Sequence, residues 1–313
     1  MQYAIIDSHA DTAQTLYLKG QTLLEGRTHI TLPKIEKLGQ YAQFFAYCPI
    51  CHPDMDPEAL YRRGRSYFLD QIEKNTDRIA LCGSTVQMQE AWQAQKAAAF
   101  FAIEGAEAIG CDPGRLEEAH RDGVRMVTLT WNFENPLGGS NATGGGLTAQ
   151  GREFVKRAQS LGIIVDVSHA SDEVFFDVAE IAEKPFIASH SNSRTVCDHR
   201  RNLTDDQIRC LIQLGGAMGL NLYSVFLSGE RTSDFEDVRR HLEYVLELGG
   251  ESILALGADL DGCDTLPAGF AGVDDYEKLT DHLEGKGFPQ NLLKKICADN
   301  LMQVMDRCGL QPV

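Results

Sequence analysis

Eight short apolar runs recur along the chain, and segments with the periodicity of an α-helix lie between them. The apolar runs cover residues 3–7, 42–47, 98–103, 125–130, 163–167, 185–189, 217–221 and 253–257. Helical patterning covers residues 57–79, 152–161, 172–182, 205–214 and 235–248, with Thr204 as an expected N-cap and Gly162, Gly215 and Gly249 as expected helix stops. Strands that alternate with helices predict a parallel sheet, and eight nearly continuous apolar runs predict that the sheet closes into a (β/α)₈ barrel.

A doubly wound open sheet is the alternative, and it would place a nucleotide-binding loop after an early strand. The glycine-rich stretch 138–146 has neither GxGxxG spacing nor the Lys-Ser/Thr pair of a phosphate loop, so it is interpreted as a βα loop after the fourth strand. A barrel of this kind commonly reaches 313 residues as one domain, so a single domain is expected over 1–313.

The charge balance limits the classes of partner. Lys and Arg total 29 against 45 Asp and Glu, which gives a net charge of −16. That field repels polyanions, so neither nucleic acid nor an anionic membrane is expected as a partner. The N-terminus shows no pattern of a targeting segment, and the nine cysteines are odd in number and scattered. We therefore expect a cytoplasmic protein with reduced cysteines.

Polar residues follow five of the eight predicted strands. The residues are His9 and Asp11 after the first strand, Glu104 after the third, His169 after the fifth, His190 after the sixth, and Asp259 with Asp261 after the eighth. In a barrel the carboxyl ends of all strands meet at one rim, where active sites lie. His and carboxylate groups at that rim favour a zinc site.

The prediction of metal rests on the set of residues, because each residue alone has an ordinary structural explanation. A single His at a strand end is more often a structural group than a ligand, and Asp7, Asp166 or Asp261 could each act as a turn or cap residue. His9 and Asp11 support one another, since residues i and i+2 of an extended strand point the same way. Three histidines and three carboxylates exceed the four ligands of one tetrahedral zinc, so two metals that share a ligand are predicted.

The run Cys48-Pro49-Ile50-Cys51-His52 matches both a c-type haem attachment motif and a CxxC redox motif. Haem attachment requires export, and a zinc site would need a second pair of ligands nearby. Two ordinary cysteines in the second βα loop are the preferred interpretation, and a redox switch at the rim is the alternative. The histidines outside the rim set are interpreted as structural or solvated; they are His29, His52, His120, His199, His241 and His282.

Taken in order, these motifs resemble the membrane dipeptidase (renal dipeptidase) family of binuclear zinc peptidases. The resemblance runs nearly end to end and is carried by residues 7–11, 103–105, 166–169, 189–191, 200–202 and 257–262. It implies a (β/α)₈ TIM-like barrel of the metal-dependent hydrolase type. Related barrels usually open with HxH and bridge their metals with a modified Lys, whereas this chain has HxD and a Glu.

The resemblance also implies a role for each site residue. His9 and Asp11 would hold one zinc, His169 and His190 the second, and Glu104 would bridge the two. Asp259 would act as acid and base beside the bridging water. Arg201 would bind the free carboxylate of the substrate, with Arg200 as a solvated neighbour; a guanidinium fork is well shaped for that task.

The implied reaction is hydrolysis of dipeptides, L,L and also L,D, by a hydroxide that bridges two zinc ions. Members of the family are often dimeric, so a homodimer is a candidate assembly. One position departs from the family: many members carry His at the end of the fourth strand, where this chain has Trp131. Trp131 could contact substrate through its indole N–H or simply wall the pocket. The alternatives are another metal-dependent amide hydrolase or deaminase on the same barrel, and a metal-bearing binding protein with little turnover.

Overall fold

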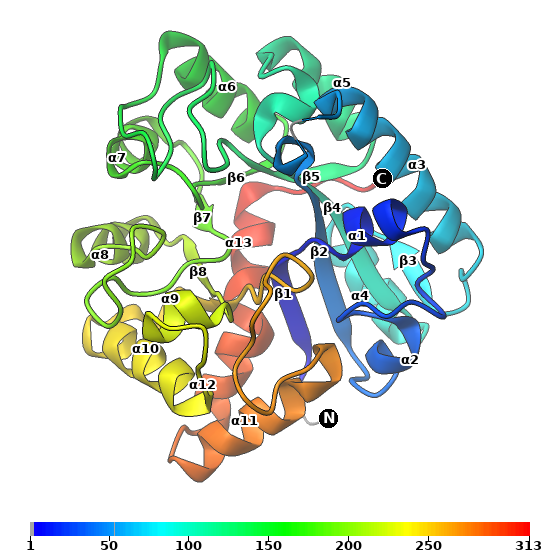
Figure 1. Ribbon diagram of the computed structural model, residues 1–313, viewed down its shortest axis with the longest axis vertical. Helices are drawn as coiled ribbons and strands as arrows, with labels where there is room; N and C mark the ends of the chain where they lie inside the picture. The colour runs from blue at the N-terminus through cyan, green and yellow to red at the C-terminus, as the bar shows by residue number, and fades with distance from the viewer. Residues whose placement is uncertain (1–2, 53) are drawn as a thin grey trace.

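A closed barrel of eight parallel strands forms the centre of the molecule (Figure 1). The computed structural model describes residues 3–52 and 54–313. The barrel strands are β1 (Ile5–Ala10), β2 (Tyr41–Tyr47), β4 (Ala97–Glu104), β5 (Val124–Thr128), β6 (Ile164–Asp166), β7 (Ile187–Ala188), β8 (Ala217–Leu220) and β9 (Leu254–Leu256). Parallel pairing of β1 with both β2 and β9, and of β2 with β4, closes the ring. The predicted barrel and all eight predicted strands are confirmed.

One strand lies outside the eight-membered ring. The strand β3 (Ile79–Leu81) pairs with the first residues of β4, and it begins where the sequence predicted the end of a helix over 57–79. That prediction is wrong at its C-terminal end, because α3 (Pro57–Glu73) stops six residues earlier. The polar turn 74–78 separates the two elements, and within it the Asn75 side chain donates a hydrogen bond back to the Gln71 carbonyl. Such local side-chain bonding competes with helix continuation.

The predicted caps of the connecting helices are confirmed where the structure describes them. Thr204 and Gln207 form a reciprocal capping box at the start of α8 (Asp205–Leu214), and Gly215 ends that helix with φ of 63°. The remaining helices are α1 (Thr12–Lys19), α2 (Leu32–Ile35), α4 (Thr85–Gln93), α5 (Leu116–Arg121), α6 (Ala149–Ser160), α7 (Asp172–Ile181), α9 (Ser224–Ser228), α10 (Phe235–Glu247), α11 (Tyr276–Gly285), α12 (Gln290–Lys294) and α13 (Asn300–Cys308).

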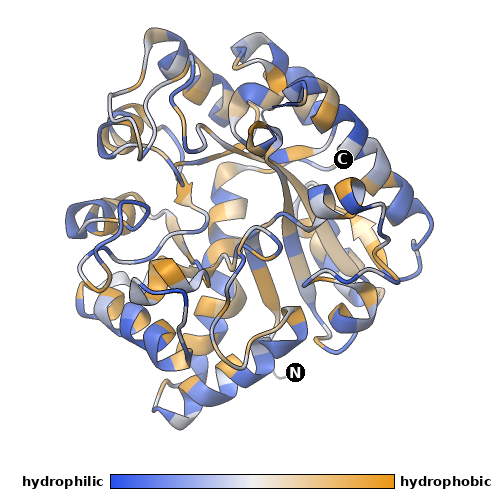
Figure 2. Ribbon diagram, viewed as in Figure 1, coloured by the Kyte–Doolittle hydropathy of each residue, from blue (hydrophilic) through white to orange (hydrophobic). Residues whose placement is uncertain are grey.

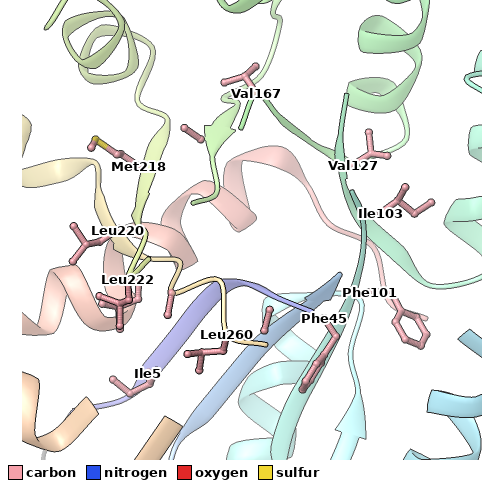
Figure 3. Close-up of a cluster of buried hydrophobic side chains, with 14 of the residues drawn as sticks. Ile5, Phe45, Phe101, Ile103, Val127, Val167, Met218, Leu220, Leu222 and Leu260 are labelled. Atoms are coloured by element: carbon pink, nitrogen blue, oxygen red, sulfur yellow. The ribbon is translucent and has the colours of Figure 1, made fainter. Parts of the chain in front are cut away.

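Two hydrophobic layers lie on the two faces of the barrel sheet. The outer layer, which includes Ile5, Phe45 and Phe101 (Figure 3), packs against the surrounding helices. The inner layer fills the barrel with residues such as Phe44 and Phe100, and it continues onto one face of α13 through the side chains Leu301, Val304 and Met305. Helix α13 therefore covers the end of the barrel at which the strands begin.

This arrangement leaves the opposite end of the barrel for polar chemistry. Figure 2 shows mostly hydrophobic strands at the centre and helices of mixed character around them. Within the described residues no helix is both long enough and apolar enough to cross a bilayer.

The cysteine pattern corrects one interpretation of the sequence. Cys48 and Cys51 form a disulfide, whereas all nine cysteines were expected to be reduced. Pro49 starts the short 3-10 turn η1 (Pro49–Cys51), in which the Cys51 N–H donates to the Cys48 carbonyl at 3.1 Å. This tight turn brings the two sulfurs together. The CxxC spacing was the signal for such a pair, although two ordinary cysteines were the preferred interpretation. The other seven cysteines are free.

Candidate metal centre

Six predicted site residues meet at the carboxyl end of the barrel, each carried by the end of a strand. Their positions are His9 as the penultimate residue of β1, Asp11 directly after that strand, Glu104 as the last residue of β4, His169 after β6, His190 after β7 and Asp259 after β9. The three histidine side chains and that of Glu104 are buried, and those of Asp11 and Asp259 are 13% and 15% exposed. The carboxyl ends of the barrel strands therefore bring together the residues that were singled out in the sequence.

Glu104 lies between two groups of side chains. Its Oε1 is 2.9 Å from His169 Nε2 and 3.4 Å from His190 Nε2, whereas its Oε2 is 3.6 Å from His9 Nε2. His9 Nε2 is in turn 3.9 Å from Asp11 Oδ2. The two oxygens of one carboxylate thus face different ligand candidates, which is the arrangement that a bridging ligand requires.

Several buried polar atoms at this centre have no hydrogen-bond partner among the described residues. They are both ring nitrogens of His9, Nε2 of His190 and Oδ1 of Asp11. Buried polar atoms are rarely left unpaired in folded proteins. Two sets of possible ligand atoms, each within 4.8 Å of one another, overlap at His9: one adds Glu104 and His190, the other Asp11 and Asp259. The donor types and the unpaired atoms therefore fit metal binding.

Hydrogen bonds to the far side of two histidine rings orient them. His169 Nδ1 lies 2.9 Å from Asn132 Oδ1, so this nitrogen is the donor and Nε2 keeps its lone pair for the centre. His190 Nδ1 lies 2.7 Å from Ser189 Oγ, and Ser189 Oγ donates to Asp166 Oδ2 at 2.6 Å. Because the Ser189 hydroxyl donates to Asp166, His190 Nδ1 is the donor to the hydroxyl oxygen, and Nε2 keeps its lone pair for the centre.

Electrostatics make the centre attractive to cations. Burial lowers the pKa of His169 to about 4, with the positive charge of Arg201 adding to the effect, and burial also lowers the pKa of His190. Burial raises the pKa of Asp11 and of Asp259, and the charge of Glu104 raises both further. The same carboxylates act on His9 in the opposite direction: against the effect of burial, Glu104, Asp11 and Asp259 raise the pKa of His9 to about 10. The crowded carboxylates thus supply the negative potential that divalent ions require, and binding of a metal at His9 would displace a proton.

Backbone conformation aims two of these side chains. His169 and Asp259 have φ of 68° and 60°, in the left-handed region that residues with a Cβ seldom adopt. Such a conformation costs about 1–2 kcal/mol per residue and is concentrated at functional sites. Each of the two residues turns the chain sharply after its strand.

The side chains of His9 and Asp11 do meet, but the predicted cause, alternation of side chains along an extended strand, is wrong. Strand β1 is irregular between Asp7 and Ala10, and Asp11 has left the strand to become the N-cap of α1. Simple alternation along a strand therefore does not place them. Instead the Asp11 N–H donates to the Leu260 carbonyl, and the Asp259 N–H donates to the His9 carbonyl, so the ends of β1 and β9 are joined.

Asp259 and Asp261 differ in what their carboxylates contact. Asp259 Oδ1 lies 3.9 Å from His9 Nε2, and its Oδ2 accepts a hydrogen bond from Asn221 at 3.1 Å. Asp261 accepts from the His29 backbone N–H at 2.8 Å and from the Thr12 hydroxyl. Asp261 therefore fastens the β9 loop to neighbouring segments, while Asp259 faces the centre.

A cavity of about 480 Å³ opens over the centre. Asp11, Glu104, His169 and Asp259 lie at its polar side, and its walls include the aromatic residues Trp131, Tyr223 and Phe226 together with the pair Cys48 and Cys51. Pockets of roughly 300–1,000 Å³ accommodate small-molecule ligands. The volume therefore suits a substrate of the size of a dipeptide. Trp131 belongs to this wall, with its ring 6.1 Å from that of His169.

Arg201 is 5% exposed and lines a smaller pocket, which shares His169 with this cavity. Its Nη2 donates to the His190 carbonyl at 3.3 Å, its guanidinium carbon lies 5.5 Å from the Phe226 ring, and its Nε has no partner among the described residues. Its pKa is lowered by burial against the opposing effect of Asp259 and Glu104, which places it within electrostatic range of the centre. Arg200, by contrast, is exposed.

Sequence reasoning missed several residues of the site. Asn221 ends a predicted strand, so reading the last residue of that run would have found it. Asn132 directly follows Trp131 and could have been noted in the same way. Tyr223 and Phe226 come from the loop and helix after β8, and no local pattern in the sequence marks them as cavity walls.

Comparison with known proteins identifies what the whole chain is similar to. A family model described as membrane dipeptidase (peptidase family M19) matches residues 1–310. An uncharacterized protein in the pqqA 5′ region of Klebsiella pneumoniae is 34% identical over 246 residues, which are 75% of this chain and 90% of that protein.

Solved structures give the same relationship. A metallo peptidase from Rhodobacter sphaeroides, in complex with a phosphinate mimic of the dipeptide L-Ala-D-Ala, superposes with a TM-score of 0.88 at 28% identity, over 98% of this chain and 99% of that one. A second metallo peptidase, dipeptidase AC, has a TM-score of 0.88 at 27% identity, with the same coverage of both chains.

Proposed function

The chain belongs to the membrane dipeptidase family, peptidase family M19, and on that basis we propose that it hydrolyses free dipeptides at a centre of two zinc ions. The observation that carries the proposal is the position of Glu104, whose two oxygens face His169 with His190 on one side and His9 on the other. His9 and Asp11 would hold one ion, His169 and His190 the other, and Glu104 would bridge them. We further propose that residues 1–313 form one barrel domain and that the protein is a cytoplasmic homodimer.

Zinc ions bound in this way would supply Lewis acidity that polarises the scissile carbonyl and lowers the pKa of a shared water towards neutrality. The residues of the chain supply the remaining steps. Asp259, with one oxygen held by Asn221 and the other near His9, accepts the proton of the attacking water and returns it to the leaving amine. Hydrogen bonds with Asn132 and Ser189 keep the His169 and His190 rings oriented during these proton transfers.

Arg201 would select a free C-terminus. Its buried guanidinium has an Nε that no described residue pairs with, and it lies within electrostatic range of the centre, so a substrate carboxylate beside the scissile bond would gain a charge-assisted contact. The relative that was solved with a mimic of L-Ala-D-Ala supports dipeptides with a D residue in second position as candidates alongside L,L dipeptides. Trp131, Tyr223 and Phe226 would line the space that the side chains of the dipeptide occupy.

Arg201→Met is expected to raise KM for free dipeptides by about 30-fold or more. Removing one partner of a buried charge pair costs about 2–5 kcal/mol, and the substrate carboxylate would then enter the cavity unpaired. The measurement is kcat and KM for a panel of L,L and L,D dipeptides and for the same dipeptides with amidated C-termini.

Amidation is expected to impair hydrolysis by the wild type and to have little effect on the variant. The matched control is Arg200→Met, which changes the exposed neighbour and should alter KM little. Equal responses of free and amidated substrates in both proteins would remove Arg201 from this role. Efficient hydrolysis of amides, or deamination, by the wild type would favour another amide hydrolase activity of the same barrel.

A further inference from the structure

The disulfide between Cys48 and Cys51 lies in the wall of the cavity that holds the proposed metal centre. Both cysteines line this cavity, as does His52, the next residue. Cys48 is 1% exposed and Cys51 is partly exposed, so a solute in the cavity meets Cys51 first. We propose that this disulfide is a reversible redox site, which thiol reductants open through the cavity and whose reduction lowers the hydrolytic activity. The effect on activity rests on the proposed dipeptidase function, whereas the redox exchange does not.

The other cysteines of the chain lack the features of a redox site. All seven are free, and only Cys210 is partly exposed. Burial raises the pKa of Cys82, Cys111, Cys297 and Cys308 to about 12, so their reactive thiolate forms are scarce near neutral pH. Exchange would therefore be confined to the one pair that reaches the cavity.

The turn closed by this disulfide contacts two segments that carry proposed metal ligands. Ile50, between the two cysteines, packs closely against Gly105, which directly follows Glu104. A Cβ added to Gly105 would lie only 3.3 Å from Ile50 Cγ2. The Cys48 carbonyl accepts a hydrogen bond at 3.1 Å from the side chain of Gln14, in the first turn of the helix that follows Asp11. The turn thus contacts the segments that directly follow Glu104 and Asp11.

Apart from the disulfide, little internal bonding holds this turn. Two backbone bonds close it, from the Cys51 N–H to the Cys48 carbonyl at 3.1 Å and from the His52 N–H to the Pro49 carbonyl at 3.2 Å. Breaking the sulfur–sulfur bond would release the cavity wall and loosen its contact with the Glu104–Gly105 segment. The rate of an enzyme reaction falls roughly 10- to 100-fold when a positioned group at the active site is displaced by about 1 Å.

The exchange balances with a thiol reductant, either one dithiol or two monothiols. A reductant thiolate attacks Cys51 Sγ, the bond between the two cysteines breaks, and Cys48 leaves as a thiolate that takes up a proton. A second thiolate attacks the resulting mixed disulfide and releases Cys51. The protein gains two electrons and two protons, and the reductant becomes its own disulfide. The reverse sequence closes the site again.

The test measures thiol state and activity together in the zinc-loaded enzyme. The protein is equilibrated with glutathione buffers of increasing reduced-to-oxidised ratio, or with reduced thioredoxin, and then quenched with an alkylating agent. Mass spectrometry of the peptide that contains residues 48–51 gives the fraction reduced, and kcat/KM for a free dipeptide is measured in parallel. We expect both cysteines to become alkylated together and kcat/KM to fall roughly 10-fold or more over the same range of ratios.

Two variants serve as controls. The double variant Cys48→Ser/Cys51→Ser should show the lowered activity at every ratio, and Cys210→Ser, on the outer helix α8, should respond as the wild type does. A fall in activity of the double variant on reduction would show that the reductant removes metal, and would overturn the proposal.

The proposal is also overturned if the pair resists alkylation in the most reducing buffer while the protein stays folded, or if reduction changes kcat/KM by less than twofold. If no dipeptide is hydrolysed in either state, the proposed function fails, and the alkylation pattern alone decides whether the pair exchanges.

Discussion

Asp259→Asn is expected to lower kcat by about 10²- to 10⁴-fold and to leave two metal ions per chain. General acid–base catalysis contributes a factor of this size, and Asn keeps the shape of the side chain without its ability to accept a proton. The five ligand candidates His9, Asp11, Glu104, His169 and His190 are unchanged in this variant. The measurements are kcat for a free dipeptide and the metal content of the same preparation.

The matched control is Asp261→Asn. Both carboxylate oxygens of Asp261 accept hydrogen bonds, one from the His29 backbone and one from Thr12, so its role is to hold the loop. We expect kcat of this variant to fall far less than that of Asp259→Asn. Equal losses in the two variants, or loss of metal from Asp259→Asn, would contradict the acid–base role of Asp259.

Glu104→Gln is expected to weaken the binding of both metal ions and to reduce activity at least as much. Each oxygen of Glu104 faces a different set of histidines, and an amide keeps only one of the two oxygens as an acceptor. The NH₂ group of Gln would present hydrogen-bond donors to one set of histidines. The substitution would also remove a negative charge from a buried site that binds cations. The measurement is metal retained after dialysis, followed by kcat/KM at saturating zinc.

Glu107→Gln, three residues further along in the turn η2 (Ala106–Ile109), is the control, since Glu107 is not among the residues that line the cavity. It should retain both ions. His169→Ala should lose one ion and keep the other. If Glu104→Gln bound two zinc ions as tightly as the wild type, a bridging role for Glu104 would be ruled out.

The barrel and the cluster of polar residues could be predicted because both follow from local patterns. A strand buried on both faces has to be apolar along its length, so each barrel strand is visible as a run, and the chain leaves it through a polar residue at a fixed end. His190 and Glu104 were found in this way. The same rule identified Asp259, although the left-handed backbone that aims it has no signature in the sequence.

Features that depend on contacts between distant segments could not be predicted. The side chains of Tyr223 and Phe226 become cavity walls only when the segment after β8 folds over the rim. Ser189 and Asp166 were visible as residues, but their link to His190 Nδ1 arises from the pairing of neighbouring strands. The disulfide between Cys48 and Cys51 depends on the turn conformation, which spacing alone does not specify.

The return of zinc to metal-free protein tests the central claim most directly. The protein is stripped with a chelator, zinc is added in measured equivalents, and hydrolysis of a free dipeptide is followed at each step. We expect no activity without metal and a rise that reaches its plateau at two equivalents per chain, because the ligand candidates form two sets that share His9, and the two oxygens of Glu104 face different histidines. Full activity at one equivalent, or activity in the metal-free protein, would contradict the account.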